Sequence, residues 1–257
     1  MTTRFLNTEV ARAKALSKCA LAAYEPATYE MQKLVSDWSS DFNDVRPVFQ
    51  ENAQAAVFSH DKFYAVAIRG TDQMQDWLDN IRVGMDELHL HPMGFSHHAN
   101  LLKYPLMDAL GSLVKQEGRK PVWFTGHSLG GACATILGLE YALSGNGYEG
   151  DYGMTAGIAT FGAPRCMTKA AVEWSKSVPF QMWRFRHRND IVPRIPKSYK
   201  HPSSAELVYI DRRDRICVDS TWPYRLQDRA ADFTLCSLVG DHPMKHYDHA
   251  VQSWNRK

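Results

Sequence analysis

The stretch that decides the fold is PVWFTGHSLGGACATILGLEYAL, from Pro121 to Leu143. Its first six residues form an apolar run with the length of a buried strand, and its second half repeats apolar residues with the period of a helix. Between the two stands the pattern G-x-S-x-G, centred on Ser128. In this pattern the serine lies on a sharp turn from strand to helix, and the flanking glycines leave room for neighbouring backbone. The stretch therefore predicts that Ser128 presents its hydroxyl clear of a sheet.

Segments typical of strands and helices alternate along the rest of the chain. Strands are predicted at residues 63–70, 121–126, 157–164, 181–187 and 205–211, and helices at residues 98–116, 128–144, 168–177 and 243–254. Such alternation indicates the α/β class, with a mostly parallel central sheet flanked by helices on both faces. Because no linker, repeat or low-complexity tract divides the 257 residues, we predict a single domain over residues 1–257.

Composition argues against several classes of protein. The formal net charge of +2 gives no electrostatic reason to expect nucleic acid or an anionic membrane as a partner. The five cysteines have no CxxC spacing, which favours free thiols over a disulfide framework or a zinc site. We predict no transmembrane segment, since no stretch reaches the roughly 18 apolar residues that a span needs. The N-terminal stretch contains no signal-peptide core, so we expect a cytoplasmic location.

A serine hydroxyl becomes a strong nucleophile only with a base, which in turn needs a carboxylate to orient it. Around a turn of this kind the carboxylate and then the histidine follow the serine along the chain. Asp190 stands after a predicted strand, in the proline-containing loop RNDIVPRIP, and is the favoured carboxylate. Asp211 is the alternative, although its stretch DRRDR is more typical of a solvated face.

Three histidines near the C-terminus are candidates for the base. His242 precedes the last predicted helix, whereas His246 and His249 lie within it, and a loop position suits a histidine that points into a site. His242 and His246 could instead share a helix face and bind a metal. Pro243 makes a helical His242 improbable, so we predict no metal site and favour His242 as the base.

Two backbone amides are candidates for an oxyanion hole. The turn after Ser128 places the Leu129 N–H at the N-terminus of a helix, where negative charge is stabilised. The stretch FYAVAIRGTD ends a predicted strand, and Gly70 there allows a tight turn that presents Thr71. Thr71 and Leu129 are therefore predicted to stabilise a tetrahedral oxyanion together.

These stretches together resemble the class 3 lipases, the fungal-lipase-like members of the α/β-hydrolase superfamily. The resemblance rests on AIRGTD, DWLDNI, GHSLGGA, ATFGAPR, NDIVPRIP and DHPMKHY, which are spread over most of the chain. It implies an α/β-hydrolase fold with Ser128 as nucleophile, Asp190 as the orienting acid and His242 as base. It also implies Thr71 and Leu129 as oxyanion donors, in agreement with the choice made from the residues themselves.

The segment TDQMQDWLDNIR carries an apolar stripe at helical spacing, formed by Met74, Trp77, Leu78 and Ile81. Periodicity alone favours a surface helix packed on the core. The resemblance instead implies a short helical lid over the serine that contributes to substrate binding. Four nearby histidines have no thiol or acidic residues at ligand spacing, so we predict no metal there; they are His89, His91, His97 and His98.

The function predicted from these residues is a serine carboxylic-ester hydrolase of the lipase or esterase type. Its substrate is expected to be an acyl ester or lipid, most typically an acylglycerol at a lipid–water interface, and no cofactor is required. The alternatives within this enzyme class are a phospholipase or lysophospholipase and an esterase for aromatic, feruloyl-type esters. A lipase-like binding protein without turnover is the alternative from another class.

Overall fold

One eight-stranded sheet organises the structure, a computed structural model that describes residues 7–71, 93–144, 153–218, 220–231 and 240–254. The strands lie side by side in sequence order and are β1 (Phe42–Gln50), β2 (Ala53–His60), β3 (Phe63–Ile68), β4 (Val122–His127), β5 (Thr155–Phe161), β6 (Gln181–His187), β7 (Glu206–Ile210) and β8 (Ile216–Val218). Strands β3 to β7 run parallel, and β1, β2 and β8 pair antiparallel with their neighbours. This mostly parallel sheet confirms the predicted α/β class.

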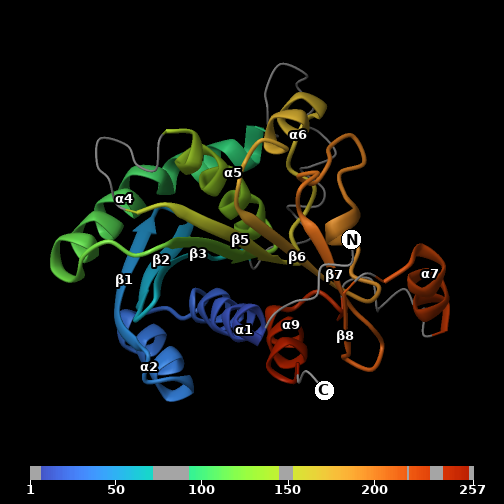
Figure 1. Cartoon of the computed structure of the whole chain (residues 1–257), viewed down its shortest axis with the longest axis horizontal. Coiled ribbons are helices and arrows are strands. Elements are labelled where there is room, and N and C mark those ends of the chain that lie inside the picture. The colour runs from blue at the N-terminus through green and yellow to red at the C-terminus, as the bar shows by residue number, and fades with distance from the viewer. Residues whose placement is uncertain (1–6, 72–92, 145–152, 219, 232–239, 255–257) are drawn as a thin grey trace.

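Helices cover both faces of the sheet (Figure 1). The first face carries α1 (Asn7–Ala22), α2 (Thr28–Trp38) and α9 (Met244–Gln252); the second carries α4 (Met93–Glu117), α5 (Leu129–Leu143) and α6 (Lys169–Ser175). Helix α7 (Trp222–Ala231) lies at the β8 end of the sheet, and a single 3-10 turn, η1 (Val192–Arg194), follows β6. No helix in the described ranges is long and apolar enough to cross a bilayer.

The two faces hold two separate apolar cores. Every residue of β4 is buried, with Trp123 in the core under α1 and α9 and Phe124 in the core under α4 and α5. Because a central parallel strand is covered on both sides, its sequence is a continuous apolar run and does not alternate between apolar and polar residues. This is why the run at Pro121–Gly126 could be identified as a strand from its sequence.

The strands that no sequence pattern predicted include both edges of the sheet. Strand β1, with the sequence FNDVRPVFQ, carries charges and Pro47, and only three of its nine residues are buried. Proline is tolerated in an edge strand because one side of that strand forms no ladder. The edge strands β1 and β8 thus lack the apolar run that identified β4, and neither was predicted. Strand β2 lies between β1 and β3 and is buried along its whole length, but it was missed as well, together with helices α2 and α7.

The cysteines in the described ranges are all free thiols: Cys19, Cys133, Cys166 and Cys217. Burial raises the pKa of the first three, and it raises that of Cys166 to about 12. These thiols are therefore protonated at neutral pH, where they act as small apolar side chains in the core.

Candidate active site

Ser128 lies on the turn between β4 and α5, as its sequence pattern predicts. Its backbone has φ 56° and ψ −129°, a region that residues with a side chain rarely adopt. The Ser128 N–H donates to the Phe161 carbonyl oxygen at 3.0 Å, and this bond fixes the turn against β5. The strained backbone sets the Ser128 hydroxyl at the carboxyl edge of the parallel strands, where α/β sheets place their sites.

The glycines around Ser128 allow three backbone segments to approach closely. A Cβ on Gly126 would lie 2.5 Å from the Gly130 carbonyl oxygen, and one on Gly130 would overlap the Ile68 carbonyl oxygen. Both distances are far inside van der Waals contact, so neither position tolerates a side chain without a backbone shift. The two glycines of the pattern are therefore required by the packing of the turn.

His242 and Asp190 form a buried pair beside this turn. His242 Nδ1 lies 2.7 Å from Asp190 Oδ2, and the two side chains are 1% and 0% exposed. Because a carboxylate can only accept, the Nδ1–H donates and Nε2 is left as the basic nitrogen. Asp190 Oδ1 also accepts from the Val192 N–H at 2.9 Å, which holds the carboxylate in the loop after β6.

Tyr247 and Gly162 support this pair, and neither was predicted from the sequence to have a role in the site. The Tyr247 hydroxyl donates to Asp190 Oδ2 at 2.6 Å, while burial and the charge of Asp190 raise the tyrosine's pKa and keep it protonated. Gly162 has φ 61°, and a Cβ there would lie 3.0 Å from Asp190 Oδ2 and 3.1 Å from His242 Cε1. The glycine in the stretch ATFGAPR is the sequence signal that could have indicated this position.

His127 packs behind the pair rather than acting on Ser128. Its Nε2 lies 2.7 Å from the His242 carbonyl oxygen and its Nδ1 lies 2.6 Å from the Tyr24 hydroxyl. Burial, and next the neighbouring His242, lower the pKa of His127 well below its ordinary value, so the ring is neutral. A neutral ring donates from one nitrogen only, and since the carbonyl can only accept, Nε2 carries the proton. His127 and Tyr24 therefore position the backbone of His242.

The predicted oxyanion donors lie on either side of the turn. Leu129 is the first residue of α5, and Thr71 follows Gly70, where a Cβ would lie 3.0 Å from the Ser128 Cβ. This close approach brings the end of the β3 segment to the serine. The predicted lid residues lie outside the described residues: Met74, Trp77, Leu78 and Ile81.

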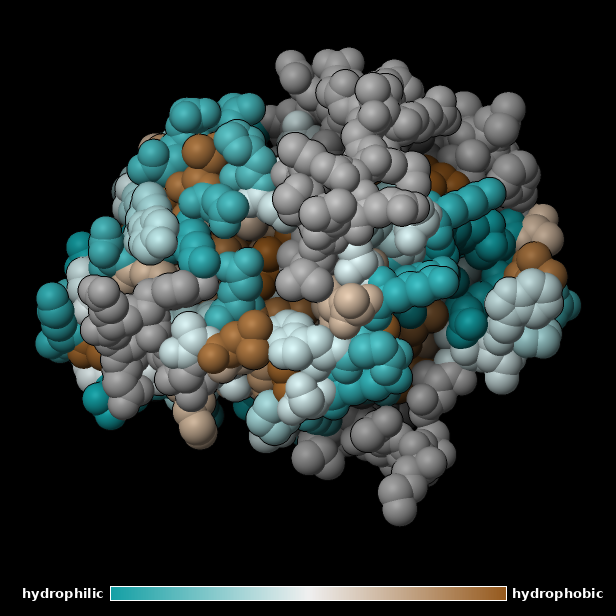
Figure 2. Space-filling view, turned by 90° about the horizontal axis from the view of Figure 1, so that it is seen from above, coloured by the Kyte–Doolittle hydropathy of each residue, from teal (hydrophilic) through white to brown (hydrophobic). Residues whose placement is uncertain are grey.

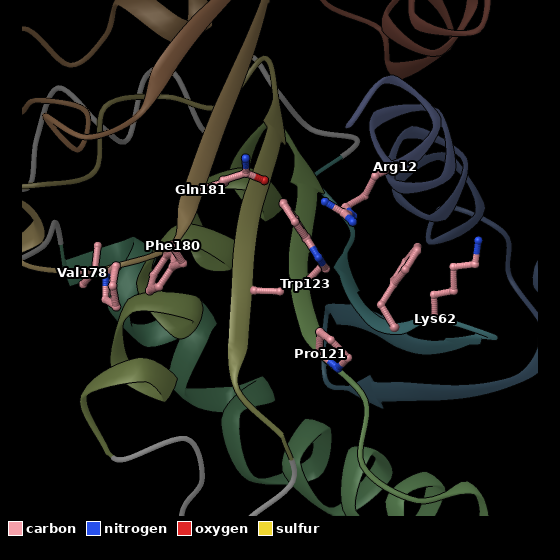
Figure 3. Close-up of a pocket in the computed structure, with 10 residues that line it drawn as sticks. Arg12, Lys62, Pro121, Trp123, Val178, Phe180 and Gln181 are labelled. Carbon is pink, nitrogen blue, oxygen red and sulfur yellow. The ribbon is translucent and has the colours of Figure 1, made fainter. Parts of the chain in front are cut away.

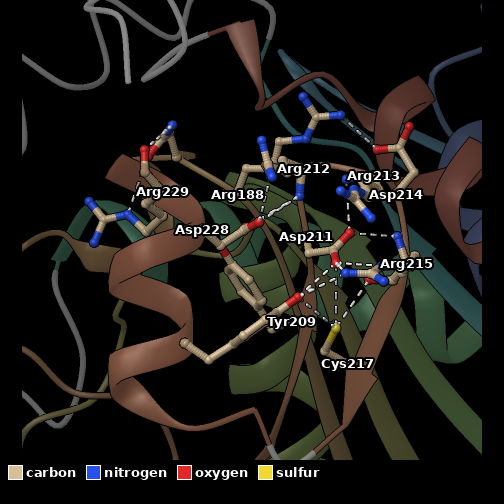
Figure 4. A network of polar contacts seen from close by, with 12 residues as sticks. Arg188, Tyr209, Asp211, Arg212, Arg213, Asp214, Arg215, Cys217, Asp228 and Arg229 are labelled. Carbon is tan, nitrogen blue, oxygen red and sulfur yellow. Dashed lines mark hydrogen bonds and ion pairs between the residues drawn. The ribbon is translucent and has the colours of Figure 1, made fainter. Parts of the chain in front are cut away.

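Asp211, the alternative acid, occupies a different network at the β7–β8 hairpin (Figure 4). It accepts hydrogen bonds from Arg215 Nε and the Tyr224 hydroxyl, both at 2.8 Å, and it is 0% exposed. The expectation of a solvated face was therefore wrong for Asp211, because Arg215 of the same hairpin and Tyr224 of α7 fold over it. Asp190 is thus hydrogen-bonded to His242, and Asp211 is hydrogen-bonded to Arg215.

A cavity of about 340 Å³ lies at the end of the strands that is opposite to Ser128 (Figure 3). Trp123 and Gln181, at the starts of β4 and β6, line it together with Arg12 and Lys62. Since Ser128 follows the other end of β4, this cavity is separate from the candidate site. In the described ranges no three His, Cys, Asp or Glu side chains come together as a metal site would need.

Two polar atoms of the candidate site have no hydrogen-bond partner in the described part of the chain. Among the described residues, neither the Ser128 Oγ nor the His242 Nε2 has a hydrogen-bond partner, although both atoms are buried. Buried polar atoms are nearly always satisfied, and exceptions are concentrated at functional sites. A serine hydroxyl and an imidazole oriented by a carboxylate are the groups that nucleophilic catalysis on an acyl group requires.

Comparison with known proteins identifies the family of this chain. A model of the family described as Lipase (class 3) matches residues 65–200, more than half of the chain. A secreted mono- and diacylglycerol lipase A from Penicillium cyclopium is 26% identical over 163 residues, covering 62% of this chain and 50% of that protein. The chain spans about half the length of the curated relatives it matches.

Solved structures share the fold at lower identity. The crystal structure of a mutant of MDLA from Penicillium cyclopium superposes with a TM-score of 0.68 at 19% identity, covering 96% of this chain and 100% of that one. A structure described as a triacylglycerol lipase with a serine protease triad as its catalytic centre has a TM-score of 0.64 at 20% identity, covering 80% of this chain and 82% of that one. The fold is therefore that of the fungal lipases.

Proposed function

The chain belongs to the class 3 lipase family, and from this premise we propose that it is a serine hydrolase that cleaves acylglycerol esters through an acyl-enzyme on Ser128. The observation that carries the proposal is the 2.7 Å contact between His242 Nδ1 and Asp190 Oδ2. This contact leaves His242 Nε2 as a base with no partner in the described part of the chain, as is also true of the Ser128 Oγ. The names of the relatives, mono- and diacylglycerol lipase and triacylglycerol lipase, support an acylglycerol as substrate.

The reaction follows from the roles of these side chains. Ser128 Oγ attacks the ester carbonyl carbon while His242 Nε2 takes its proton, and Asp190 stabilises the imidazolium that forms. The N–H groups of Thr71 and Leu129 stabilise the oxyanion. His242 then protonates the departing alcohol. A water molecule next attacks the acyl-enzyme while His242 takes its proton, and His242 returns that proton to the Ser128 Oγ as the carboxylic acid leaves.

Hydrolysis of p-nitrophenyl esters from acetate to palmitate, together with emulsified mono-, di- and triacylglycerols, tests the proposal. Replacing the nucleophile in Ser128→Ala is expected to lower kcat by about 10⁴-fold or more. The control is Ser112→Ala, which removes an exposed hydroxyl from α4 and should leave the rate unchanged.

The substrate pattern decides between the proposed function and its alternatives. An acylglycerol lipase is expected to prefer long chains and emulsified acylglycerols over soluble short esters. A wild-type protein with no Ser128-dependent turnover of any of these esters, and no labelling of Ser128 by a fluorophosphonate probe, would overturn the proposal.

A further inference from the structure

A second cavity, of about 530 Å³, lies between α7 and the segments that follow β5 and β6. Two of its eight lining residues are apolar and the other six are cations, with no carboxylate among them. The cations are Arg165, Arg186, Arg194, Lys197, Arg225 and Arg229. Strongly hydrophilic residues gather on the corresponding side of the molecule in Figure 2, where β7 and α7 lie in Figure 1.

Within the described ranges, no ion pair joins any of these six cations to a carboxylate. Their hydrogen bonds go to neutral groups: Arg194 donates to the Arg188 carbonyl at 3.2 Å, and Arg229 donates to Asn189 Oδ1 at 3.3 Å. The acidic residue of α7, Asp228, accepts instead from the Tyr209 hydroxyl at 2.8 Å and pairs with Arg212. The positive charge of the cavity is therefore not neutralised by the acidic residue of α7.

The cations occupy a place where the sheet would otherwise continue its apolar core. On β6, Met182 belongs to the core under α5, and Arg184 and Arg186 follow at alternate positions on the same face. Burial, and next the neighbouring arginines, lower the pKa of Arg186 to about 10, and its Nε has no partner among the described residues. Like charges brought together out of water are unfavourable, and a bound anion would relieve that cost.

We propose that this cavity binds the phosphate group of an anionic ligand. Guanidinium groups present paired N–H donors that match phosphate oxygens, and several of them converge here. A phosphatidic acid headgroup and free phosphate share this chemistry. The apolar lining residues Trp222 and Leu226, one helical turn apart on α7, are 66% and 45% exposed and suit the acyl chain of a lipid.

The cavity borders the loops that hold the candidate active site. Arg165 lies three residues after Gly162, and its N–H donates at 2.8 Å to the Ile195 carbonyl, beside η1. Arg194 belongs to η1, which begins two residues after Asp190. A phosphate held here would lie against the loop that carries the proposed acid, Asp190. A role of this cavity in selecting a phospholipid for cleavage rests on the proposed function. The binding of phosphate by the cavity does not.

Binding is measured with the full-length Ser128→Ala protein, so that turnover plays no part. The probes are phosphatidylcholine vesicles with and without phosphatidic acid, assayed by cosedimentation, and inorganic phosphate, assayed by calorimetry. The variants Arg225→Gln and Lys197→Gln each remove one cavity charge, and each is expected to weaken binding about 10-fold. Lys197 is exposed, so its replacement should leave the fold intact.

The control is Arg213→Gln, which removes an equal charge from an exposed position outside the cavity. Phosphatidic-acid-dependent binding that only the cavity variants weaken supports a lipid ligand. Binding of inorganic phosphate that only the cavity variants weaken, without binding to vesicles, supports a soluble phosphate ligand. An equal loss with Arg213→Gln, or no binding of either probe, overturns the proposal. Because Ser128 is absent from every arm, none of these results depends on ester hydrolysis.

Discussion

Asp190 and Asp211 follow neighbouring strands of the same sheet, and both are fully buried, yet they have different partners. Asp190 accepts from His242, whose second ring nitrogen has no partner in the described part of the chain. Asp211 accepts from Arg215 and Tyr224, which hold it within the β7–β8 hairpin. A buried acid at the end of a strand is thus not sufficient to indicate a catalytic role. The distinguishing feature is an imidazole partner whose second nitrogen forms no hydrogen bond within the described part of the chain.

The largest effect is expected from Asp190→Asn. The amide can orient the imidazole with the wrong tautomer, so Nε2 no longer accepts the Ser128 proton, and we expect kcat to fall by about 10⁴-fold. Ester hydrolysis measures the rate, and circular dichroism checks that the fold is kept. A variant within about 10-fold of wild type would remove Asp190 from the proposed mechanism, since an oriented base would then not be required.

A smaller effect is expected from Gly162→Ala. Its Cβ would press on both Asp190 and His242 and displace them, which should lower kcat by roughly 10²-fold. Gly118→Ala is the matched control, because Gly118 also has a positive φ, of 86°, but no atom within 4 Å of an added Cβ. Both variants should lose about 1 kcal/mol of unfolding free energy through backbone strain, and only Gly162→Ala should lose activity. Equal activities would show that the close contact at Gly162 does not matter.

Tyr247→Phe tests whether the tyrosine hydroxyl helps to position Asp190 and His242. Loss of the hydroxyl leaves Asp190 Oδ2 with one donor fewer in a buried site, so we expect kcat to fall by about 10-fold with KM unchanged. Tyr141→Phe removes another buried hydroxyl, which donates to the Gly153 carbonyl at 2.9 Å far from the pair along the chain. If both phenylalanine variants lower kcat equally, the effect is one of general stability and not of positioning.

The smallest effect on activity is expected from Asp211→Asn. We expect a change of less than about 2-fold in kcat, while the unfolding free energy falls by about 2 kcal/mol because a charge-assisted network is lost. Burial acts to raise the pKa of Asp211, but the hydrogen bonds from Arg215 and Tyr224 outweigh it and lower the pKa below its ordinary value.

The lowered pKa of Asp211 also fixes the sign of a pH effect. The folded state holds the carboxylate charged where the unfolded chain already binds a proton, so the stability from Asp211 is lost as pH falls below about 4. Denaturant unfolding as a function of pH should therefore show a shallower acid dependence in Asp211→Asn than in wild type. An identical acid slope in the two proteins would contradict this account of the network.

The sequence by itself determined the parts of the molecule that local patterns specify. The apolar run of β4, the glycines around Ser128 and the loop position of His242 depend on residues close together in the chain, and their physical requirements are visible there. The mostly parallel character of the sheet followed from the alternation of element types. The edge strands could not be predicted in this way, because a half-exposed strand with charges and a proline lacks the pattern of a buried one.

Tertiary structure decided which distant residues meet. His242 and Asp190 are 52 positions apart, and Tyr24 and His127 are 103 positions apart, so no local pattern connects them. Tyr247 and Gly162 support the pair only because β5, β6 and α9 converge on it. The packing of α7 against the β7–β8 hairpin buried Asp211, which the sequence favoured as solvated. Helix α7 also lies next to β6 and the segments after β5 and β6, which gathers six cations around one cavity. Periodicity records which face of an element is apolar, whereas the partner of each buried polar group is fixed by how separate elements pack together.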